Sequence, residues 1–149
     1  MIHKQTPIAQ VMTRDVISLN PDSPMKLVAE IYETHNFHHI PILNKKGKVK
    51  GILSKTEFHK LLHGFTIFKL KSAAKFNEEV FLSVTAGEIM TKQVATLYPD
   101  DTLETAMGYF RENLFHAAPV INRETHKLEG IVTTFDLLNF IFQKELLLT

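Results

Sequence analysis

Two short segments of the chain place a hydroxyl residue three positions before a carboxylate. Ser54 precedes Glu57 in the first segment, and Thr133 precedes Asp136 in the second. This spacing is typical of a capping box, in which both side chains satisfy free amides in the first turn of a helix. The same helix N-terminus can instead hold a phosphate on its free N–H groups, and a carboxylate one turn in can accept hydrogen bonds from both hydroxyls of a ribose. Spacing alone leaves both interpretations open.

The chain has eight histidines, which raises the question of a metal site. His59 and His63 are spaced i, i+4 on a predicted helix, so their rings could supply two ligands on one face. No third ligand of matching spacing is evident in the sequence. We therefore predict no metal site and keep a metal-responsive protein as the weakest alternative. His38 and His116 occupy the same place in an internal repeat described below, which favours a buried, hydrogen-bonded structural role for both.

No arrangement of residues in the sequence indicates catalysis. The six glycines form neither a G-x-G-x-x-G motif nor a phosphate-binding loop. The adjacent acidic pairs, Glu78-Glu79 and Asp100-Asp101, diverge on a helix or turn and do not face each other. The lack of cysteine excludes disulfides, thiolate metal sites and cysteine nucleophiles. We predict no catalytic residue, no enzymatic activity and no required cofactor.

Composition places the chain among ordinary globular domains, with 44% hydrophobic and 22% charged residues in 149. The net charge of +1 gives no electrostatic reason to expect a nucleic-acid or anionic-membrane partner. Apolar runs such as 137–142 are much shorter than the roughly 20 residues that a membrane span needs. The first ten residues contain no apolar signal core. We expect a cytoplasmic location.

The chain contains an internal repeat, which appears when the sequence is shifted by 78 positions against itself. VMTRDVISLNPD (11–22) then lies over IMTKQVATLYPD (89–100), and FHHIPILN (37–44) lies over FHAAPVIN (115–122). After a slip of one residue in the following loop, GILSKTE matches GIVTTFD. We place repeat 1 at 8–62, repeat 2 at 86–142, and an ordered linker or helical extension at 63–85.

Each repeat is predicted to run strand, helix, hairpin and helix. The first helix begins at a good N-cap residue, Ser23 in repeat 1 and Asp101 in repeat 2. The second helix follows the hairpin at once, from Lys55 or from Thr134. The strands are expected at 16–19, 39–43 and 49–53 in repeat 1, and at 94–97, 117–121 and 128–132 in repeat 2.

The ordered set of motifs in each repeat resembles the CBS domain, and the tandem pair resembles a Bateman module. Each copy opens with Met-Thr, continues through V-x-S/T-L and a Pro-Asp turn, and ends with G-I-x-S/T-x-x-D/E. The resemblance covers nearly the whole chain except the linker. It implies an α+β fold of two β-α-β-β-α repeats, related by a pseudo-twofold axis, with their small sheets packed together.

CBS pairs commonly bind adenosyl ligands, such as AMP, ADP, ATP, S-adenosylmethionine or NAD, in two clefts between the repeats. Each cleft in similar proteins combines the hydroxyl and acid of one repeat with the Met-Thr segment of the other. Carried over to this chain, the first cleft uses Thr133 and Asp136 for phosphate and ribose, with Thr13, Val16 and Ile17 on the adenine side. The second cleft uses His39, Ser54, Glu57, Thr91, Val94 and Ala95.

The two implied clefts differ in quality. Glu57 is one methylene longer than the usual aspartate, whereas Ala117 replaces the basic residue that His39 supplies in repeat 1. We favour the Thr133/Asp136 cleft, because its carboxylate fixes the ribose while the phosphate can still use helix amides.

The resemblance also implies a regulatory module that binds AMP, ADP or ATP and passes a conformational change to an unidentified regulated protein, without nucleic acid or membrane. The competing hypothesis is a ligand-free structural or interaction module, in which the hydroxyl and acid pairs only cap helices. A homodimer is expected. Its candidate surface is the apolar side of the second helices, which core burial would explain equally: Phe58, Leu61, Leu62, Leu137, Leu138, Ile141 and Phe142.

Overall fold

The computed structural model describes residues 4–67, 73–113 and 115–146. The chain forms two compact units, each with its own hydrophobic core. Unit 1 comprises Met1–Val16 and Val94–Thr149, and unit 2 comprises Ile17–Gln93. The units do not coincide with the sequence repeats. The first residues of repeat 1 belong to unit 1, with the hairpin of repeat 2, and the first residues of repeat 2 belong to unit 2, with the hairpin of repeat 1. We call this arrangement the exchange of segments.

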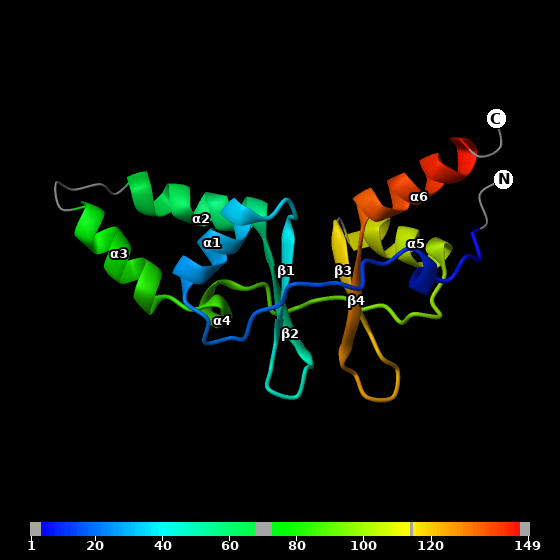
Figure 1. The fold of residues 1–149 in the computed structure, drawn as a ribbon, viewed down its shortest axis with the longest axis horizontal. Helices are drawn as coiled ribbons and strands as arrows, with labels where there is room; N and C mark the ends of the chain where they lie inside the picture. The colour runs from blue at the N-terminus through cyan, green and yellow to red at the C-terminus, as the bar shows by residue number, and fades with distance from the viewer. Residues whose placement is uncertain (1–3, 68–72, 114, 147–149) are drawn as a thin grey trace. The chain divides into compact units, whose positions relative to one another are not determined.

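Unit 2 is built on the hairpin of β1 (His39–Leu43) and β2 (Val49–Ser54), which pair antiparallel with Pro41 opposite Ile52. Its helices are α1 (Met25–Thr34), α2 (Lys55–Ile67), α3 (Ala73–Ser83) and α4 (Ala86–Ile89), as Figure 1 shows. The apolar residues of α1 recur at helical spacing, so they share one buried face. The core contains Met25, Val28, Ile31, Tyr32, Ile40, Ile42, Leu53, Phe58 and Ala86.

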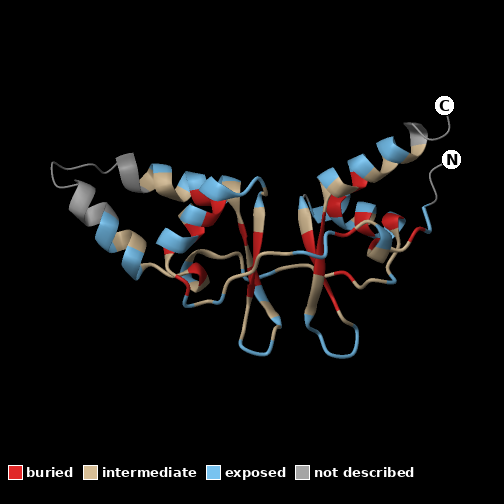
Figure 2. Cartoon of the chain, in the orientation of Figure 1, coloured by how far each residue is buried: buried red, intermediate tan, exposed pale blue. Residues whose placement is uncertain are grey.

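Unit 1 has the same plan around β3 (Ala117–Ile121) and β4 (Leu128–Thr133), with Pro119 opposite Ile131. A short 3-10 helix, η1 (Ile8–Gln10), precedes the helices α5 (Leu103–Asn113) and α6 (Thr134–Leu146). In both units the middle residues of the hairpin strands are buried, as the red segments of Figure 2 show. The core contains Ile8, Met12, Leu97, Leu103, Ala106, Phe110, Ala118, Val120, Val132 and Leu137.

The mixed α+β fold, both hairpins and both second helices are as predicted from the sequence. The linker contributes the end of α2 and all of α3, while residues 68–72 lie outside the described part of the chain. No helix in the described residues is long and apolar enough to cross a membrane.

The predicted strands at 16–19 and 94–97 are wrong. Each is reduced to a single parallel bridge, Leu19 with Ile42 and Leu97 with Val120. Leu19 N–H donates to the Pro41 carbonyl at 3.1 Å, and Leu43 N–H donates back to Leu19 at 2.8 Å. The ladder cannot continue because a proline, which has no N–H to donate, follows two residues later in both repeats.

The first helices begin later than predicted, at Met25 and Leu103. The two residues expected as N-caps close the preceding turns instead. Ser23 Oγ accepts from Asn20 N–H at 3.3 Å, and Asp101 Oδ2 accepts from Tyr98 N–H at 2.7 Å. Both side chains can form either a cap or a local turn, and here the turn takes the acceptor oxygen.

The buried role expected for His38 and His116 is also wrong, because both side chains are exposed. Their backbone carbonyls do have a structural role at this position. They accept from the first amides of the second helices, Lys55 N–H at 2.7 Å and Thr134 N–H at 3.0 Å.

Candidate functional site

The start of helix α6 in unit 1 carries a complete capping box. Thr133 donates its N–H at 2.8 Å and its hydroxyl at 2.7 Å to Asp136 Oδ2. Asp136 N–H donates in return to Thr133 Oγ1 at 3.1 Å. One carboxylate oxygen is thus occupied by the cap, which leaves Oδ1 directed toward another part of the unit.

That other part is the Met-Thr segment of repeat 1. Thr13 and Ile131 exchange two backbone hydrogen bonds of 2.9 Å, which places Thr13 beside strand β4. Thr13 Oγ1 lies 3.5 Å from Asp136 Oδ1, at the limit of a hydrogen bond. Residues from both sequence repeats therefore meet in one compact unit, where Asp136 Oδ1 keeps acceptor capacity for a further donor.

A glycine makes this close approach of two backbones possible. A Cβ added at Gly130 would lie 2.8 Å from the Thr13 carbonyl oxygen and 2.8 Å from Met12 Sδ. The corresponding Cβ at Gly51 would lie 2.8 Å from the Thr91 carbonyl oxygen. This contact explains why each repeat has a glycine three positions before its hydroxyl residue.

Unit 2 contains a related arrangement at the start of α2. Ser54 Oγ accepts from Glu57 N–H at 3.0 Å and donates to Glu57 Oε2 at 3.1 Å. Thr91 pairs through its backbone with Ile52, and its hydroxyl donates to Glu57 Oε2 at 3.3 Å. Glu57 thus receives two hydroxyl hydrogen bonds on one oxygen, and its exposed side chain reaches farther from the helix than Asp136 does.

Sequence reasoning missed Tyr32, which lies beneath the unit 2 site. Its buried hydroxyl donates to the Leu53 carbonyl at 2.8 Å, directly before Ser54. Burial, with a smaller contribution from the charge of Glu57, raises the pKa of this phenol well above its usual range. Shifting the repeats against each other would have revealed the difference, because Phe110 stands in the place of Tyr32.

The structure brings together only part of each predicted cleft within a unit. Unit 1 holds Thr13, Val16, Thr133 and Asp136, whereas Ile17 belongs to unit 2 and packs against its core. Unit 2 holds His39, Ser54, Glu57 and Thr91, whereas Val94 and Ala95 belong to unit 1. We call the unit 1 group (Thr13, Thr133, Asp136) half-site 1 and the unit 2 group (Ser54, Glu57, Thr91) half-site 2.

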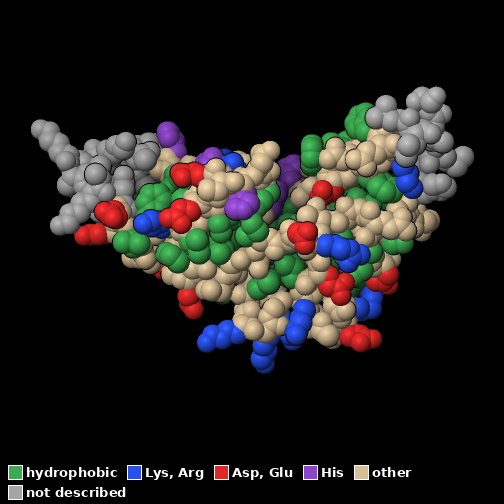
Figure 3. All heavy atoms as spheres, viewed as in Figure 1, with side chains coloured by type: hydrophobic (Ala, Val, Ile, Leu, Met, Phe, Trp, Pro, Cys, Tyr) green, Lys and Arg blue, Asp and Glu red, His purple; other side chains and the backbone are tan. Residues whose placement is uncertain are grey.

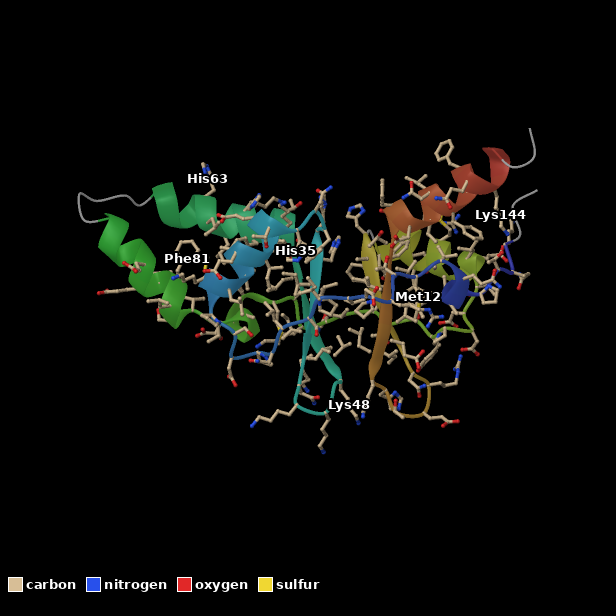
Figure 4. The ribbon with its side chains drawn as sticks, in the orientation of Figure 1. Met12, His35, Lys48, His63, Phe81 and Lys144 are labelled. Atoms are coloured by element: carbon tan, nitrogen blue, oxygen red, sulfur yellow. The ribbon has the colours of Figure 1, made fainter. Side chains whose placement is uncertain are left out.

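The histidines do not gather with other metal ligands in the described residues, where no three His, Asp or Glu side chains form a cluster. His59 and His63 are both exposed on α2, and Figure 4 shows His63 on the outer side of that helix.

The comparison with protein families decides the identity of the repeats. A family model of the CBS domain matches residues 8–64 and 86–143. The chain belongs to the CBS-domain family. The Met-Thr segments and the hydroxyl and acid pairs described above are thus parts of a tandem CBS pair.

Similar proteins support the same fold. Uncharacterized protein MJ1225 of Methanocaldococcus jannaschii is 30% identical over 133 residues, which is 89% of this chain. Its crystal structure superposes with a TM-score of 0.77 and covers 94% of this chain and 49% of that one. The chain spans 46% of MJ1225 and smaller shares, 20% and 27%, of two further curated relatives.

Two other solved CBS pairs contain adenosyl ligands. The CBS pair of MJ0100, in complex with 5′-methylthioadenosine and S-adenosylmethionine, has a TM-score of 0.74 at 22% identity over 93% of this chain and 98% of that one. CBSX2, in complex with AMP, has a TM-score of 0.75 at 18% identity over 93% and 98% of the two chains. At these identities the likeness shows the fold.

Proposed function

We propose that this CBS pair is a cytoplasmic regulatory module that binds an adenosyl ligand, with half-site 1 as the principal site. The observation that carries the proposal is that the two carboxylate oxygens of Asp136 have different partners. One carboxylate oxygen completes the helix cap, while the other faces Thr13 with acceptor capacity left over. The adenosyl ligands of two similar CBS pairs support the same ligand class.

Each group in half-site 1 has a distinct proposed role. Asp136 Oδ1 accepts hydrogen bonds from the ribose hydroxyls, because an ionised carboxylate is an acceptor with two oxygens. Phosphate is proposed to bind at the positive end of the α6 dipole, where it would replace the partners that the first amides and the Thr133 hydroxyl have in the cap. Thr13 and Val16 line the adenine side, and Ile17 remains a predicted member of this group.

Half-site 2 is proposed as a second, weaker site for the same class of ligand. Glu57 Oε2 already receives two hydroxyls, and the longer side chain loses more rotamer freedom when it is fixed. His39 supplies an imidazole on β1 that repeat 2 lacks, and we propose it as a phosphate contact of this site. Val94 and Ala95 remain predicted members of the second site.

Regulation requires that the ligand bind two states of the module with different affinity, because equal affinity shifts no equilibrium. We propose that AMP, ADP or ATP shifts the module between such states and that a regulated protein responds. A homodimer is part of this proposal. Leu137 of α6 is buried in the core, but Phe135, Leu138 and Phe142 of the same helix are exposed and apolar.

The competing function is a ligand-free interaction module, and a specific observation favours it. Both hydroxyl and acid pairs do cap their helices, and α4 carries a further box of Thr85 with Glu88. In the described residues this spacing therefore gives a cap at three helix starts, so the presence of a cap alone does not require a ligand.

The substitution Asp136→Asn separates the two functions. Its amide oxygen can keep the cap by accepting from Thr133, but its NH2 group can no longer accept from ribose hydroxyls. Under the binding proposal, wild-type melting temperature rises by several degrees with AMP or S-adenosylmethionine near 100 times the Kd, which corresponds to about 2.7 kcal/mol. The Asn variant should lose most of that rise.

Matched variants control for the loss of a cap. Glu88→Gln alters a capping box outside half-site 1 and should leave the ligand response at that site unchanged. Thr133→Val should weaken AMP more than the phosphate-free 5′-methylthioadenosine. A screen of AMP, ADP, ATP and S-adenosylmethionine in which wild type and Asp136→Asn give the same melting temperatures would favour the interaction module.

A further inference from the structure

The β1–β2 hairpin of unit 2 carries a concentrated positive charge. Residues 44–54 contain four lysines and no acidic residue, in a chain whose net charge is only +1. All four side chains are exposed. Figure 3 shows cationic side chains projecting from this hairpin, and Figure 4 places Lys48 near its tip, away from α2. We call this group of four, Lys45, Lys46, Lys48 and Lys50, the lysine hairpin.

The backbone that presents these charges is well ordered by hydrogen bonds. Asn44 Oδ1 accepts from the amides of Lys46 and Lys48, both at 3.0 Å. Asn44 N–H donates to the Lys48 carbonyl at 2.9 Å, and Gly47 adopts a φ of 76°, which favours glycine. Lys45, Lys46 and Lys48 therefore lie on a hydrogen-bonded turn, and Lys50 lies on the strand that follows it.

The four lysine side chains are not neutralised by any residue in the described part of the chain. Within the described residues no ion pair or side-chain hydrogen bond joins any of them to another group. Repeat 2 provides the comparison: Arg123 donates to both carboxylate oxygens of Asp100, at 2.9 and 3.0 Å, and lies 4.0 Å over the ring of Tyr98. Lys45 holds the place of Arg123 and Asp22 that of Asp100, but the repeat 1 residues form no such pair.

The two hairpins thus differ in charge although they share one backbone plan. The repeat 2 hairpin balances Arg123 and Lys127 with Glu124 and Glu129, and Glu129 also accepts from Asn122 at 2.7 Å. Neither the turn of the hairpin nor the cap of the helix after it requires four lysine side chains without ion-pair partners. The asymmetry points to a role outside the folding of unit 2.

We propose that the lysine hairpin is a docking surface for an acidic segment of a partner protein. Carboxylates complement compact ammonium charges, and oppositely charged surfaces steer two proteins together. The hairpin between residues 44 and 50 has no arginine and no aromatic residue, which are the groups that bind nucleic-acid phosphates bidentately and stack on bases. It also presents no exposed apolar side chain that would enter a lipid layer.

The test uses the full chain and a fluorescein-labelled peptide of alternating glutamate and serine, with a glutamine and serine peptide as the neutral probe. The test variant replaces Lys45, Lys46, Lys48 and Lys50 by glutamine. The control variant replaces four other exposed lysines by glutamine and so removes the same charge: Lys4, Lys26, Lys60 and Lys127. Binding is followed by fluorescence anisotropy at about 50 mM and about 300 mM salt, because screening separates exposed charge pairs from other contacts.

The proposal expects the wild-type chain to bind the glutamate peptide at low salt. The test variant should lose about tenfold or more in affinity, while the control variant should stay within about twofold. Equal losses in both variants would overturn the proposal, because net charge alone would then explain binding. Tighter hairpin-dependent binding of phosphatidylserine vesicles or of a single-stranded oligonucleotide would overturn it in favour of that partner. The melting-temperature response to AMP is read in parallel, and it reports on the adenosyl site independently of the hairpin.

Discussion

At the scale of single residues, the two repeats differ at the position of Tyr32. Its hydroxyl donates to the Leu53 carbonyl at 2.8 Å, whereas Phe110 fills the equivalent place in unit 1 without a hydroxyl. The phenol also packs against Phe58, with ring centroids 5.5 Å apart. The hydrogen bond from Tyr32 therefore fixes the backbone directly before Ser54 in half-site 2, and Phe110 cannot form this bond in unit 1.

Tyr32→Phe is expected to destabilise the folded chain by about 1–2 kcal/mol, because it removes the buried donor and keeps the ring. Urea denaturation at neutral pH measures the change. Tyr109→Phe is the matched control, since Tyr109 is 38% exposed, and it should change stability by less than about 0.5 kcal/mol. Equal effects of the two substitutions would show that the Tyr32 hydroxyl contributes nothing specific.

The same residue predicts a pH dependence. Burial raises the pKa of Tyr32 in the folded chain, so the unfolded chain releases this proton at lower pH, near 10. The stabilisation from the neutral phenol is complete below that pH and is lost as pH rises further. The stability difference between wild type and Tyr32→Phe should therefore shrink above about pH 10, which the same urea titrations detect.

At the scale of the elements, the hairpins depend on glycine to admit a neighbouring segment. Gly130 lies where β4 meets the Met-Thr segment, and its missing side chain leaves room for two backbone hydrogen bonds between Thr13 and Ile131. Gly108 of α5 has no atom within 4 Å of its potential Cβ. Gly130 is therefore required for a close backbone contact, whereas the space around Gly108 would admit a side chain.

Gly130→Ala should destabilise the chain by about 1–3 kcal/mol, because the new methyl group meets the Thr13 carbonyl, which cannot move without breaking the bridge. Gly108→Ala should stabilise it by about 0.5–1 kcal/mol, because alanine restricts the unfolded chain and suits a helix interior. Thermal denaturation of both variants checks the pair. A neutral Gly130→Ala would show that the segment can shift away from the strand at little cost.

At the scale of the whole molecule, the exchange of segments makes each core depend on both sequence repeats. Ile8 and Met12 come from repeat 1 but are buried in the core of unit 1, next to residues of repeat 2. Ala86 comes from repeat 2 but is buried in the core of unit 2. A single repeat cut from the chain would therefore lack part of its unit's core.

Ile8→Ala should cost about 2–5 kcal/mol, as expected for a fully buried aliphatic side chain. Hydrogen exchange should accelerate first in the amides of β3 and β4, although they lie in the other repeat. Met25→Ala is the counterpart in unit 2 and should act first on β1 and β2. For Ile8→Ala, faster exchange confined to β1 and β2, the hairpin of its own repeat, would contradict the exchange of segments.

The sequence predicted well those features that depend on neighbours along the chain. The hairpin strands follow from short apolar runs around a turn, and the second helices follow from hydroxyl and acid pairs at capping distance. The sequence-based prediction was wrong where a residue can adopt either of two local conformations of similar energy. Ser23 and Asp101 close turns instead of capping helices, and Leu19 and Leu97 each form one bridge instead of a strand.

The sequence by itself therefore determined the repeat, the family, the hairpins and the hydroxyl and acid pairs that begin the second helices. The resemblance to CBS domains implied that Thr13 joins the Thr133/Asp136 pair, but only the tertiary structure shows the contact itself and the glycine that permits it. Thr13 reaches Asp136 across 123 positions of the chain, because Gly130 leaves space for its backbone and two backbone hydrogen bonds join Thr13 to Ile131. Such a contact depends on packing between distant segments, and no local pattern of residues encodes that packing.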